Sequence, residues 1–382
     1  MRFRKKHSCR FFPWAMTTVN RPSVLYVHVP FCAHICAYCD FCHVAYEEKK
    51  AKEWLDALRR QIEMEGIGER LKTLYIGGGT PVSLNHGQLD ELLSLFDHRL
   101  GDGIEYTVEI NPEALDMEKA MILARHGVNR ASIGMQSANE GELALLGRKH
   151  TASDVMHAVA LLRDKGIDNI SLDLMYSLPG QTMESLAISV DMALAMRPRH
   201  MSLYSLTIEE NTVFGKRGYE PLDEDIEADM YEWICERLQQ EGFVHYEIAN
   251  FCQEGYASRH NLAYWTYRDF QGISCGASGK EGNIRYDATR SLREYIGNPV
   301  AKTITTLDQQ DICFEMAMMN LRLREGMDIS MFEKTCGATL EEAFGEKVVE
   351  LERRGMVETS GGFLRCTSKG YPLLNSILAE LL

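Results

Sequence analysis

Four cysteines lie close together in the stretch Cys32-Ala-His-Ile-Cys36-Ala-Tyr-Cys39-Asp-Phe-Cys42. They follow an apolar run, residues 24–29, that predicts a buried strand. Soft thiolate ligands select zinc or iron–sulfur clusters, and a structural zinc site usually takes four ligands as two separated pairs. The triplet Cys32, Cys36 and Cys39 has no second pair nearby, so its spacing favours a [4Fe–4S] cluster over zinc or incidental thiols. Three thiolates would leave one iron of such a cluster free to bind another group.

This C-x3-C-x2-C triplet is the hallmark of the radical S-adenosylmethionine (SAM) superfamily, and other segments extend the resemblance. They are Tyr26-Val-His-Val-Pro-Phe-Cys32, Gly77-Gly-Gly-Thr-Pro81, Glu109-Ile-Asn-Pro-Glu113, Ser132-Ile-Gly-Met-Gln136 and Leu172-Asp-Leu-Met-Tyr-Ser-Leu-Pro-Gly-Gln181. Together they resemble one branch of that superfamily. The branch holds the oxygen-independent coproporphyrinogen III dehydrogenases and the heme chaperones named HemW. The resemblance covers residues 26–299 and weakly beyond.

The resemblance implies that Cys32, Cys36 and Cys39 hold the cluster and that SAM binds the free iron. It also implies a set of SAM-contacting residues: Tyr26, Tyr38, Gly78, Gly79, Thr80, Glu109, Gln136, Arg148 and Asp173. Glycines let a backbone approach a ligand closely, and a guanidinium suits the carboxylate of the cofactor. Taken singly, each residue also has an ordinary interpretation as a rim charge, a loop hydrogen-bonder or a core side chain. No catalytic residue is assigned.

Two positions separate the members of this branch. The dehydrogenases carry a fourth cysteine where this chain has Phe41, so Cys42 is one position out of register and is interpreted as an incidental loop cysteine rather than a redox-labile thiol. The segment His260-Asn-Leu-Ala-Tyr-Trp265 matches the HNxxYW motif of the heme chaperones, which implies heme contact at His260. The alternative for His260 is a buried histidine in an aromatic cluster. Cys275 is a departure from the family's Gly-x-Gly-Ala turn, with no meaning assigned.

These features favour a heme-binding chaperone that transfers heme to apo-proteins, with the cluster and SAM regulating or enabling the transfer. One alternative is an oxygen-independent coproporphyrinogen III dehydrogenase, which would decarboxylate propionates in porphyrin biosynthesis. Another is a radical SAM methyltransferase that modifies heme. The expected partners are heme, an apo-hemoprotein recipient and an electron donor.

Composition narrows the class of partner and the compartment. The net charge of −14 and the absence of a long Lys/Arg run argue against nucleic acid as a partner. Eleven cysteines with no secretory signal and a cluster motif predict reduced thiols in the cytoplasm. No apolar stretch reaches the ~18 residues that a membrane-spanning helix needs, although transient membrane association stays open. The basic and aromatic residues 1–15 are interpreted as an extended start, with Met16 the more natural first residue.

The elements that must position these residues alternate between strands and helices. Strands are expected at 24–29, 73–76, 106–110, 131–134, 170–175 and 200–206, and helices at 51–64, 88–96, 118–126, 153–165 and 183–196. Such alternation predicts parallel βαβ units, here an α/β fold with an incomplete (β/α)6 TIM-like radical SAM barrel. Each motif then follows or ends a strand, so all of them should lie on one rim of the barrel.

Four segments divide the chain. We expect an N-terminal extension at 1–21, the barrel at 22–245, a barrel-covering segment with the HNxxYW motif at 246–304, and a C-terminal domain at 305–382. Because His260 follows the six strands, it should lie on the cover, away from the cysteines. The C-terminal domain shows helical patterns at 308–323, 328–333 and 340–354, then a hairpin around Gly361-Gly362 and a last helix. This order resembles a small winged-helix α+β domain, without a basic recognition helix.

Overall fold

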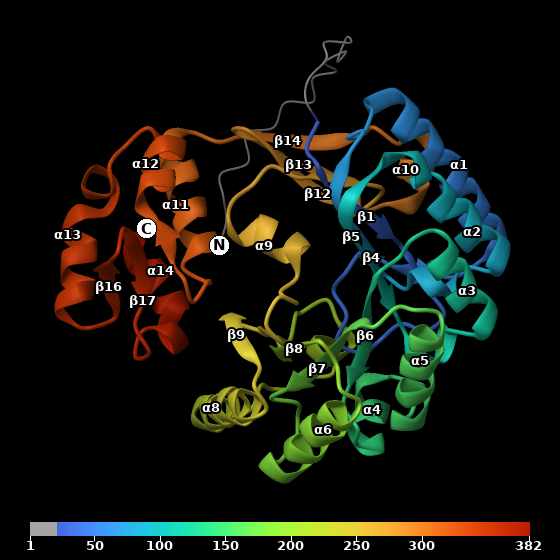
Figure 1. Ribbon diagram of the computed structural model, residues 1–382, viewed down its shortest axis with the longest axis horizontal. Helices are drawn as coiled ribbons and strands as arrows, with labels where there is room; N and C mark the ends of the chain where they lie inside the picture. Colours follow the sequence, from blue (N-terminus) through green and yellow to red (C-terminus); the bar gives the residue numbers. More distant parts are fainter. Residues whose placement is uncertain (1–20) are drawn as a thin grey trace.

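A nine-stranded curved sheet is the centre of the chain in the computed structural model, which describes residues 21–382. Six of its strands are parallel and follow the chain order: β1 (Val24–Val29), β4 (Leu71–Gly78), β5 (Leu100–Ile110), β6 (Arg130–Gln136), β7 (Asn169–Tyr176) and β8 (His200–Ser205). The two edge strands of the sheet are not paired with each other (Figure 1). The predicted incomplete (β/α)6 barrel is confirmed. Of the N-terminal extension predicted at 1–21, only Arg21 falls within the described residues.

Helices cover the outer side of the sheet (Figure 1). The predicted ones are present as α1 (Glu48–Glu65), α2 (His86–Ser94), α3 (Met117–Arg125), α5 (Ala152–Asp164), α6 (Met183–Ala195) and α8 (Glu224–Gln240). Along α1, Trp54, Leu55 and Leu58 recur at helical spacing and are fully buried. Capping boxes at Thr151 and Thr182 fix where α5 and α6 begin. A short helix, α4 (Glu140–Leu146), was not predicted.

The two faces of the sheet differ in chemistry because side chains alternate along a strand. On β5, Tyr106, Val108 and Ile110 belong to the apolar core shared with the helices. Glu105, Thr107 and Glu109 therefore point the other way, into the barrel interior. The interior is polar along the neighbouring strands as well, with the side chains of Tyr26, His28, Thr73, Tyr75, Arg130, Ser132, Ser171, Asp173, His200 and Ser202. Burial of so many polar groups points to a binding cavity rather than a packing core.

The segment predicted to cover the barrel also extends the sheet at both edges. β9 (Val244–Glu247) and β10 (Asn250–Cys252) add antiparallel strands beyond β8, while β11 (Gln271–Ile273) pairs parallel with β1. The helix α9 (Arg259–Trp265) lies inside the curve of the sheet (Figure 1). A second, antiparallel sheet follows, with β12 (Ser278–Glu281), β13 (Ile284–Ala288) and β14 (Lys302–Thr306).

The C-terminal part builds a core of its own. It contains α11 (Gln309–Asn320), α12 (Ile329–Cys336), α13 (Leu340–Arg353) and α14 (Leu374–Leu381) around β15 (Met327–Asp328), β16 (Val357–Ser360) and β17 (Phe363–Cys366). The predicted helices and hairpin are present, with β15 as an additional strand beside β17. The predicted domain boundary at 305 falls inside β14, one residue before its end. The exact division of the chain therefore stays a prediction.

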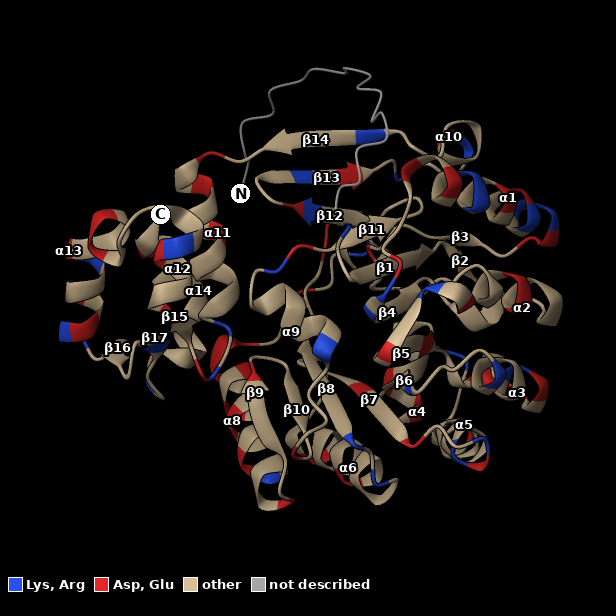
Figure 2. Cartoon of the chain, turned by 45° about the horizontal axis from the view of Figure 1, so that its top comes forward, with Lys and Arg blue, Asp and Glu red and all other residues tan. Residues whose placement is uncertain are grey.

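Charged side chains of both signs occur on α1 and α3, whereas α8 is mostly acidic (Figure 2). The overall charge of −14 is thus carried partly by a single helix. Among the described residues, none of the helices combines the length and the apolar character needed to span a membrane.

Candidate functional site

The cysteine loop begins directly after β1. Pro30 separates β1 from β2 (Phe31–Cys32), which pairs with β3 (Val44–Ala45) through short parallel bridges. Between these strands the loop is tied to two other elements. The Ala37 amide donates to Leu146 O at the end of α4 over 2.9 Å, and the Phe214 amide donates to Ala37 O over 3.1 Å. The loop is therefore held by contacts at its middle and at both ends.

The three predicted ligands Cys32, Cys36 and Cys39 are half-buried free thiols on this loop. Each sulfur has one polar neighbour. Thr80 Oγ1 lies 3.8 Å from Cys32 Sγ, an Arg148 guanidinium nitrogen lies 3.6 Å from Cys36 Sγ, and His43 Nδ1 lies 3.6 Å from Cys39 Sγ. Hydrogen-bond donors beside thiolates are the usual surroundings of an iron–sulfur cluster.

The donor set fits a cluster better than a single ion. Within residues 21–382, no group of three or more His, Cys, Asp and Glu side chains could hold one metal ion. A cubane makes no such demand, because each thiolate binds a different iron. Burial raises the pKa of Cys32 to about 11 and also raises the pKa of Cys39, so these thiols would lose their protons on binding iron.

The glycines that end β4 allow close approach to this loop. A Cβ atom on Gly79 would lie 2.6 Å from Phe31 O and 3.1 Å from Cys32 Sγ. A Cβ on Gly77 would lie 2.6 Å from the carboxyl carbon of Glu109, and Gly78 has a φ of +107°. Only glycine fits such positions. The Gly-Gly-Gly-Thr segment thus brings the end of β4 against both the cysteine loop and Glu109.

Two carboxylates face the interior from neighbouring strands. Glu109 accepts hydrogen bonds from the Tyr75 hydroxyl (2.8 Å) and the Gly78 amide (2.9 Å). Burial raises the pKa of Glu109 to about 7, and the nearby Asp173 adds to the increase. Asp173 accepts from Ser132 (2.8 Å) on the next strand, and burial raises its pKa too. Both groups are ready to gain from a positive charge placed between them.

Arg130 lies between these acids and the histidines of the barrel floor. It is only 2% exposed, and its Nε has no hydrogen-bond partner among the described residues. Its charge lowers the pKa of both Glu109 and Asp173. Two carboxylates and one guanidinium leave one unit of negative charge when all are ionised. This balance suits a ligand that carries one extra positive charge, such as a sulfonium.

A second polar group surrounds Arg148. Its guanidinium donates to Gly134 O (2.7 Å) and Asn111 Oδ1 (3.0 Å). A Cβ on Gly134 would lie 2.8 Å from Gln136 Nε2 and 3.2 Å from the Arg148 guanidinium, so these side chains meet. Gln136 has a φ of +62°, which is rare for a side chain of its size and turns it off the strand direction. Asn111 belongs to this group and was missed, although it lies in the Glu109–Glu113 segment.

The two predicted tyrosines lie on opposite sides of the cysteine loop. The hydroxyl of Tyr26 on β1 is 3.0 Å from His28 Nδ1, while His28 Nε2 is 2.7 Å from Cys42 O. Burial, with Glu109 nearby, raises the pKa of Tyr26. Tyr38 packs beside the small apolar cluster that includes Phe214, and burial raises its pKa as well.

His260 is not on a cover, as predicted, but packed against the inner strands. It is 1% exposed, and Thr73 Oγ1 (2.9 Å) and the Tyr264 hydroxyl (2.7 Å) occupy its two ring nitrogens. Its amide donates to Glu105 Oε1 over 2.8 Å. Burial lowers the pKa of His260 to about 3, so the ring is neutral. The buried-histidine alternative describes this geometry, because neither nitrogen is open to an iron.

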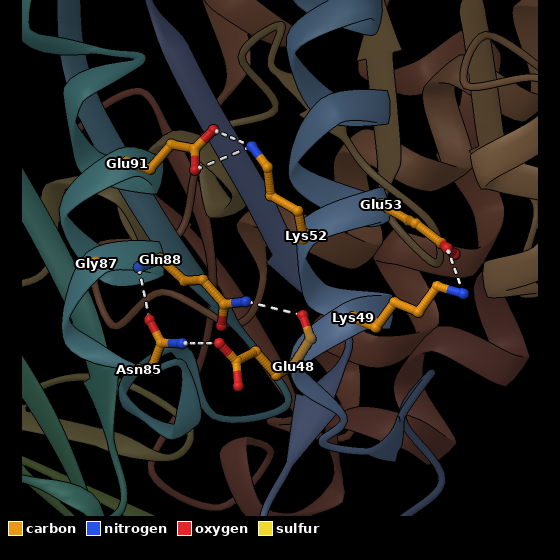
Figure 3. Close-up of a pocket in the computed structure, with 8 residues that line it drawn as sticks. All are labelled: Glu48, Lys49, Lys52, Glu53, Asn85, Gly87, Gln88 and Glu91. Carbon is orange, nitrogen blue, oxygen red and sulfur yellow. Dashed lines mark hydrogen bonds and ion pairs between the residues drawn. The ribbon is translucent and has the colours of Figure 1, made fainter.

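A surface hollow of about 890 Å³ lies elsewhere, between α1 and α2 (Figure 3). Its polar side chains mostly bind one another: Lys52 pairs with Glu91, and Asn85 pairs with Glu48. None of the predicted site residues lines it. The barrel rim, where the cysteine loop, the glycines, the two carboxylates and Arg148 gather, is therefore the candidate site.

Two family models match the chain in separate parts. The model of the radical SAM superfamily matches residues 26–193, and the model of the HemN C-terminal domain matches residues 307–373. The first range contains the cysteine loop and the rim residues through Asp173. The second covers most of the C-terminal core.

Curated relatives match nearly the whole chain. The heme chaperone HemW of Lactococcus lactis is 36% identical, with 95% of this chain and 98% of that protein covered. Those of Bacillus subtilis and Escherichia coli are 35% and 33% identical over 94% of this chain. Among solved structures, coproporphyrinogen III oxidase (HemN) from Escherichia coli superimposes with a TM-score of 0.83, covering 95% of this chain and 90% of that one. At 22% identity, this likeness supports the fold alone.

Proposed function

This chain belongs to the HemW family of heme chaperones within the radical SAM superfamily, and we propose that it binds heme and transfers it to an apo-protein. The observation that carries the proposal is the extent of the similarity, 36% identity over 95% of the chain. It includes the barrel, the segment with the HNxxYW motif and the C-terminal part. A match to the barrel alone would support only the superfamily.

We propose that Cys32, Cys36 and Cys39 hold a [4Fe–4S] cluster and that the rim residues hold SAM. When bound, the cluster supplies an electron that can reduce the sulfonium of SAM. Arg148 is suited to the carboxylate of the cofactor through a forked contact. Glu109 and Asp173 are suited to the positive sulfonium side, since both carry raised pKa values in its absence.

The residue after Asp40 supports the chaperone over the dehydrogenase. Phe41 occupies the position of the fourth cysteine of the dehydrogenases, and its side chain is 68% exposed. It offers no thiol to a cluster or a substrate. Cys42, the next residue, is buried at 9% exposure and turned toward Arg290 O. We therefore place dehydrogenase activity second.

The site of heme on this chain stays a proposal. Contact of heme iron with His260 would require α9 to move, because Thr73 and Tyr264 occupy both ring nitrogens. The structure therefore favours an axial ligand other than His260. An apo-hemoprotein recipient, an electron donor and a reducing cytoplasm complete the proposal, and the free thiols among the described residues fit that compartment.

The decisive experiment offers two compounds to the anaerobically reconstituted protein. One sample receives hemin and the other receives coproporphyrinogen III with a reductant and SAM. We expect hemin to bind tightly and to pass to an added apo-hemoprotein, with no vinyl product in the second sample. A Cys32→Ala variant is the matched control for dependence on the cluster. Vinyl product formation, with no transfer of hemin, would replace the chaperone by the dehydrogenase.

A further inference from the structure

Two cysteines that the proposed function does not use lie side by side. Cys42 ends the cysteine loop, three residues after Cys39, and Cys275 follows β11 near the other end of the barrel sequence. Both are free thiols in the structure, with 9% and 0% of their surfaces exposed. The pairing of β11 with β1 explains how they meet, because β1 leads directly into the cysteine loop.

The contact between them is direct. A Cβ atom on Gly276 would lie 2.4 Å from Cys42 Cβ and 3.1 Å from Cys42 Sγ, so the Cys42 side chain packs onto the backbone that carries Cys275. The two thiols are hydrogen-bonded to each other. This bond lowers the pKa of Cys42 and raises the pKa of Cys275, which separates an attacking thiolate from its partner thiol.

Surrounding groups hold both side chains in place. Cys42 Sγ is 3.1 Å from Arg290 O, and Cys42 O is 2.7 Å from His28 Nε2. On the other side, Ser274 Oγ lies 3.9 Å from Cys275 Sγ. The Arg290 guanidinium also donates to Asp40 O, so the last part of the cysteine loop is attached to the segment after β13. The pair is thus a fixed feature of the fold.

We propose that Cys42 and Cys275 form a redox-active dithiol, distinct from the three cluster ligands, that peroxide oxidises to a disulfide. The interpretation of Cys42 as an incidental cysteine is thereby revised. The Cys42 thiolate attacks one oxygen of hydrogen peroxide, which gives a sulfenic acid and hydroxide. The Cys275 sulfur then attacks the sulfenic sulfur, forms the S–S bond and displaces the second hydroxide. With the two thiol protons these hydroxides make two water molecules, and the peroxide accepts the two electrons that the thiols lose.

The disulfide would link the cysteine loop to the turn after β11. Since β11 is an edge strand paired with β1, the loop would stay attached to the sheet when an oxidant has removed the cluster. A dithiol reductant would reverse the bond by exchange. This role rests on the geometry of Cys42 and Cys275 and does not depend on heme transfer, so either proposal can fail without the other.

Thiol mapping of the full-length, cluster-free protein tests the proposal. Reduced protein is treated with hydrogen peroxide, unfolded in N-ethylmaleimide, digested without reductant and analysed by mass spectrometry. We expect the Cys42 and Cys275 peptides to be joined and to separate after reduction. Cys252, buried at 3% exposure on β10, is the control that should stay fully alkylated.

Two variants make the result specific. In Cys275→Ser, the sulfenic acid on Cys42 has no thiol to resolve it and should be trapped by dimedone. In Cys42→Ser, the joined peptide should be lost. If either variant misfolds, the wild-type peptide map alone decides. Free Cys42 after peroxide has consumed Cys32, Cys36 or Cys39 would overturn the proposal, and so would a disulfide between Cys42 and one of those ligands.

Discussion

The hydroxyl of Tyr75 donates a hydrogen bond of 2.8 Å to Oε1 of Glu109. The ring of the same tyrosine lies 5.1 Å from the imidazole of His260, tilted by 32°. A line of contacts therefore runs from the buried HNxxYW motif, through Tyr75, to a carboxylate at the rim. Tyr75 was not among the predicted site residues, yet it holds one of them in position.

Tyr75→Phe should weaken SAM binding by roughly tenfold, because a hydrogen bond to a charged group contributes about 1.5–3 kcal/mol. Loss of the hydroxyl leaves the Glu109 carboxylate with the Gly78 amide alone among its printed donors. The dissociation constant of SAM, measured anaerobically on the reconstituted protein, is the readout.

Tyr106→Phe is the matched control for this change. Tyr106 lies on the helical side of β5, and its buried hydroxyl has no hydrogen-bond partner among the described residues. We expect SAM binding to be unchanged in this variant. Equal weakening in both variants would mean that the Tyr75 effect is a general loss of packing.

SAM binding should strengthen as the pH rises through about 7. Burial raises the pKa of Glu109 to about 7, so the group is partly protonated at neutral pH in the cofactor-free protein. A bound sulfonium favours the carboxylate, and binding then releases a proton. Below that pKa, affinity should fall by up to about tenfold per pH unit, and above it the dependence should level off. A titration of the SAM dissociation constant between pH 6 and 8.5, roughly one to one and a half units either side of that pKa, measures it.

Glu109→Gln should remove this dependence and leave a lower, flat affinity. Asp173 and Arg130, which also act on Glu109, are unchanged in that variant. A slope that persists in Glu109→Gln would assign the proton to another group, with Asp173 the next candidate, since burial raises its pKa too.

Replacement of Cys32, Cys36 or Cys39 by Ala should abolish the iron–sulfur absorption of the reconstituted protein and its cleavage of SAM. Cys42→Ala should keep both, because the Cys42 thiol is turned toward Arg290 O and Cys275. Iron content and visible absorption of the four variants are compared after identical reconstitution. Equal loss of iron in Cys42→Ala would contradict the three-ligand assignment.

The repeating strand–helix pattern was enough to predict the rim. Each strand buried on both sides reads as a short apolar run, and parallel strands place their carboxyl ends at one edge. For this reason Glu109, Gln136 and Asp173, far apart in sequence, could be predicted to gather with the cysteine loop. Glycines 77–79 were recognisable because their position after a strand leaves few other reasons for three in a row.

Contacts that depend on the curvature of the sheet could not be predicted. Tyr75 reads as an ordinary strand tyrosine until its partner on β5 is known, and the meeting of Cys42 with Cys275 requires the pairing of β11 with β1. His260 was misplaced because its chain position, after the six strands, says nothing of how deeply α9 inserts. Sequence spacing predicts which residues share a strand or helix, but not which distant segment closes over them.

His260→Ala tests whether this histidine is structural or binds heme. The change leaves the hydroxyls of Thr73 and Tyr264 without their partner in a buried place, and each such group costs about 1–3 kcal/mol. The midpoint of urea unfolding should therefore fall clearly, with an unchanged slope. Heme retained by the folded variant should keep its Soret position, since both ring nitrogens are already occupied in the wild type.

The acid dependence of stability gives a second readout for His260. Burial lowers its pKa to about 3, below that of an unfolded histidine, so the unfolded chain binds more protons below about pH 6.5. Wild-type stability must then fall as the pH decreases through this range, and His260→Ala should show a shallower decrease. His98→Ala, at an exposed position, is the control and should change stability by less than about 0.5 kcal/mol. A shifted Soret band with unaltered stability and acid dependence would instead identify His260 as the heme ligand, and α9 would then have to open when heme binds.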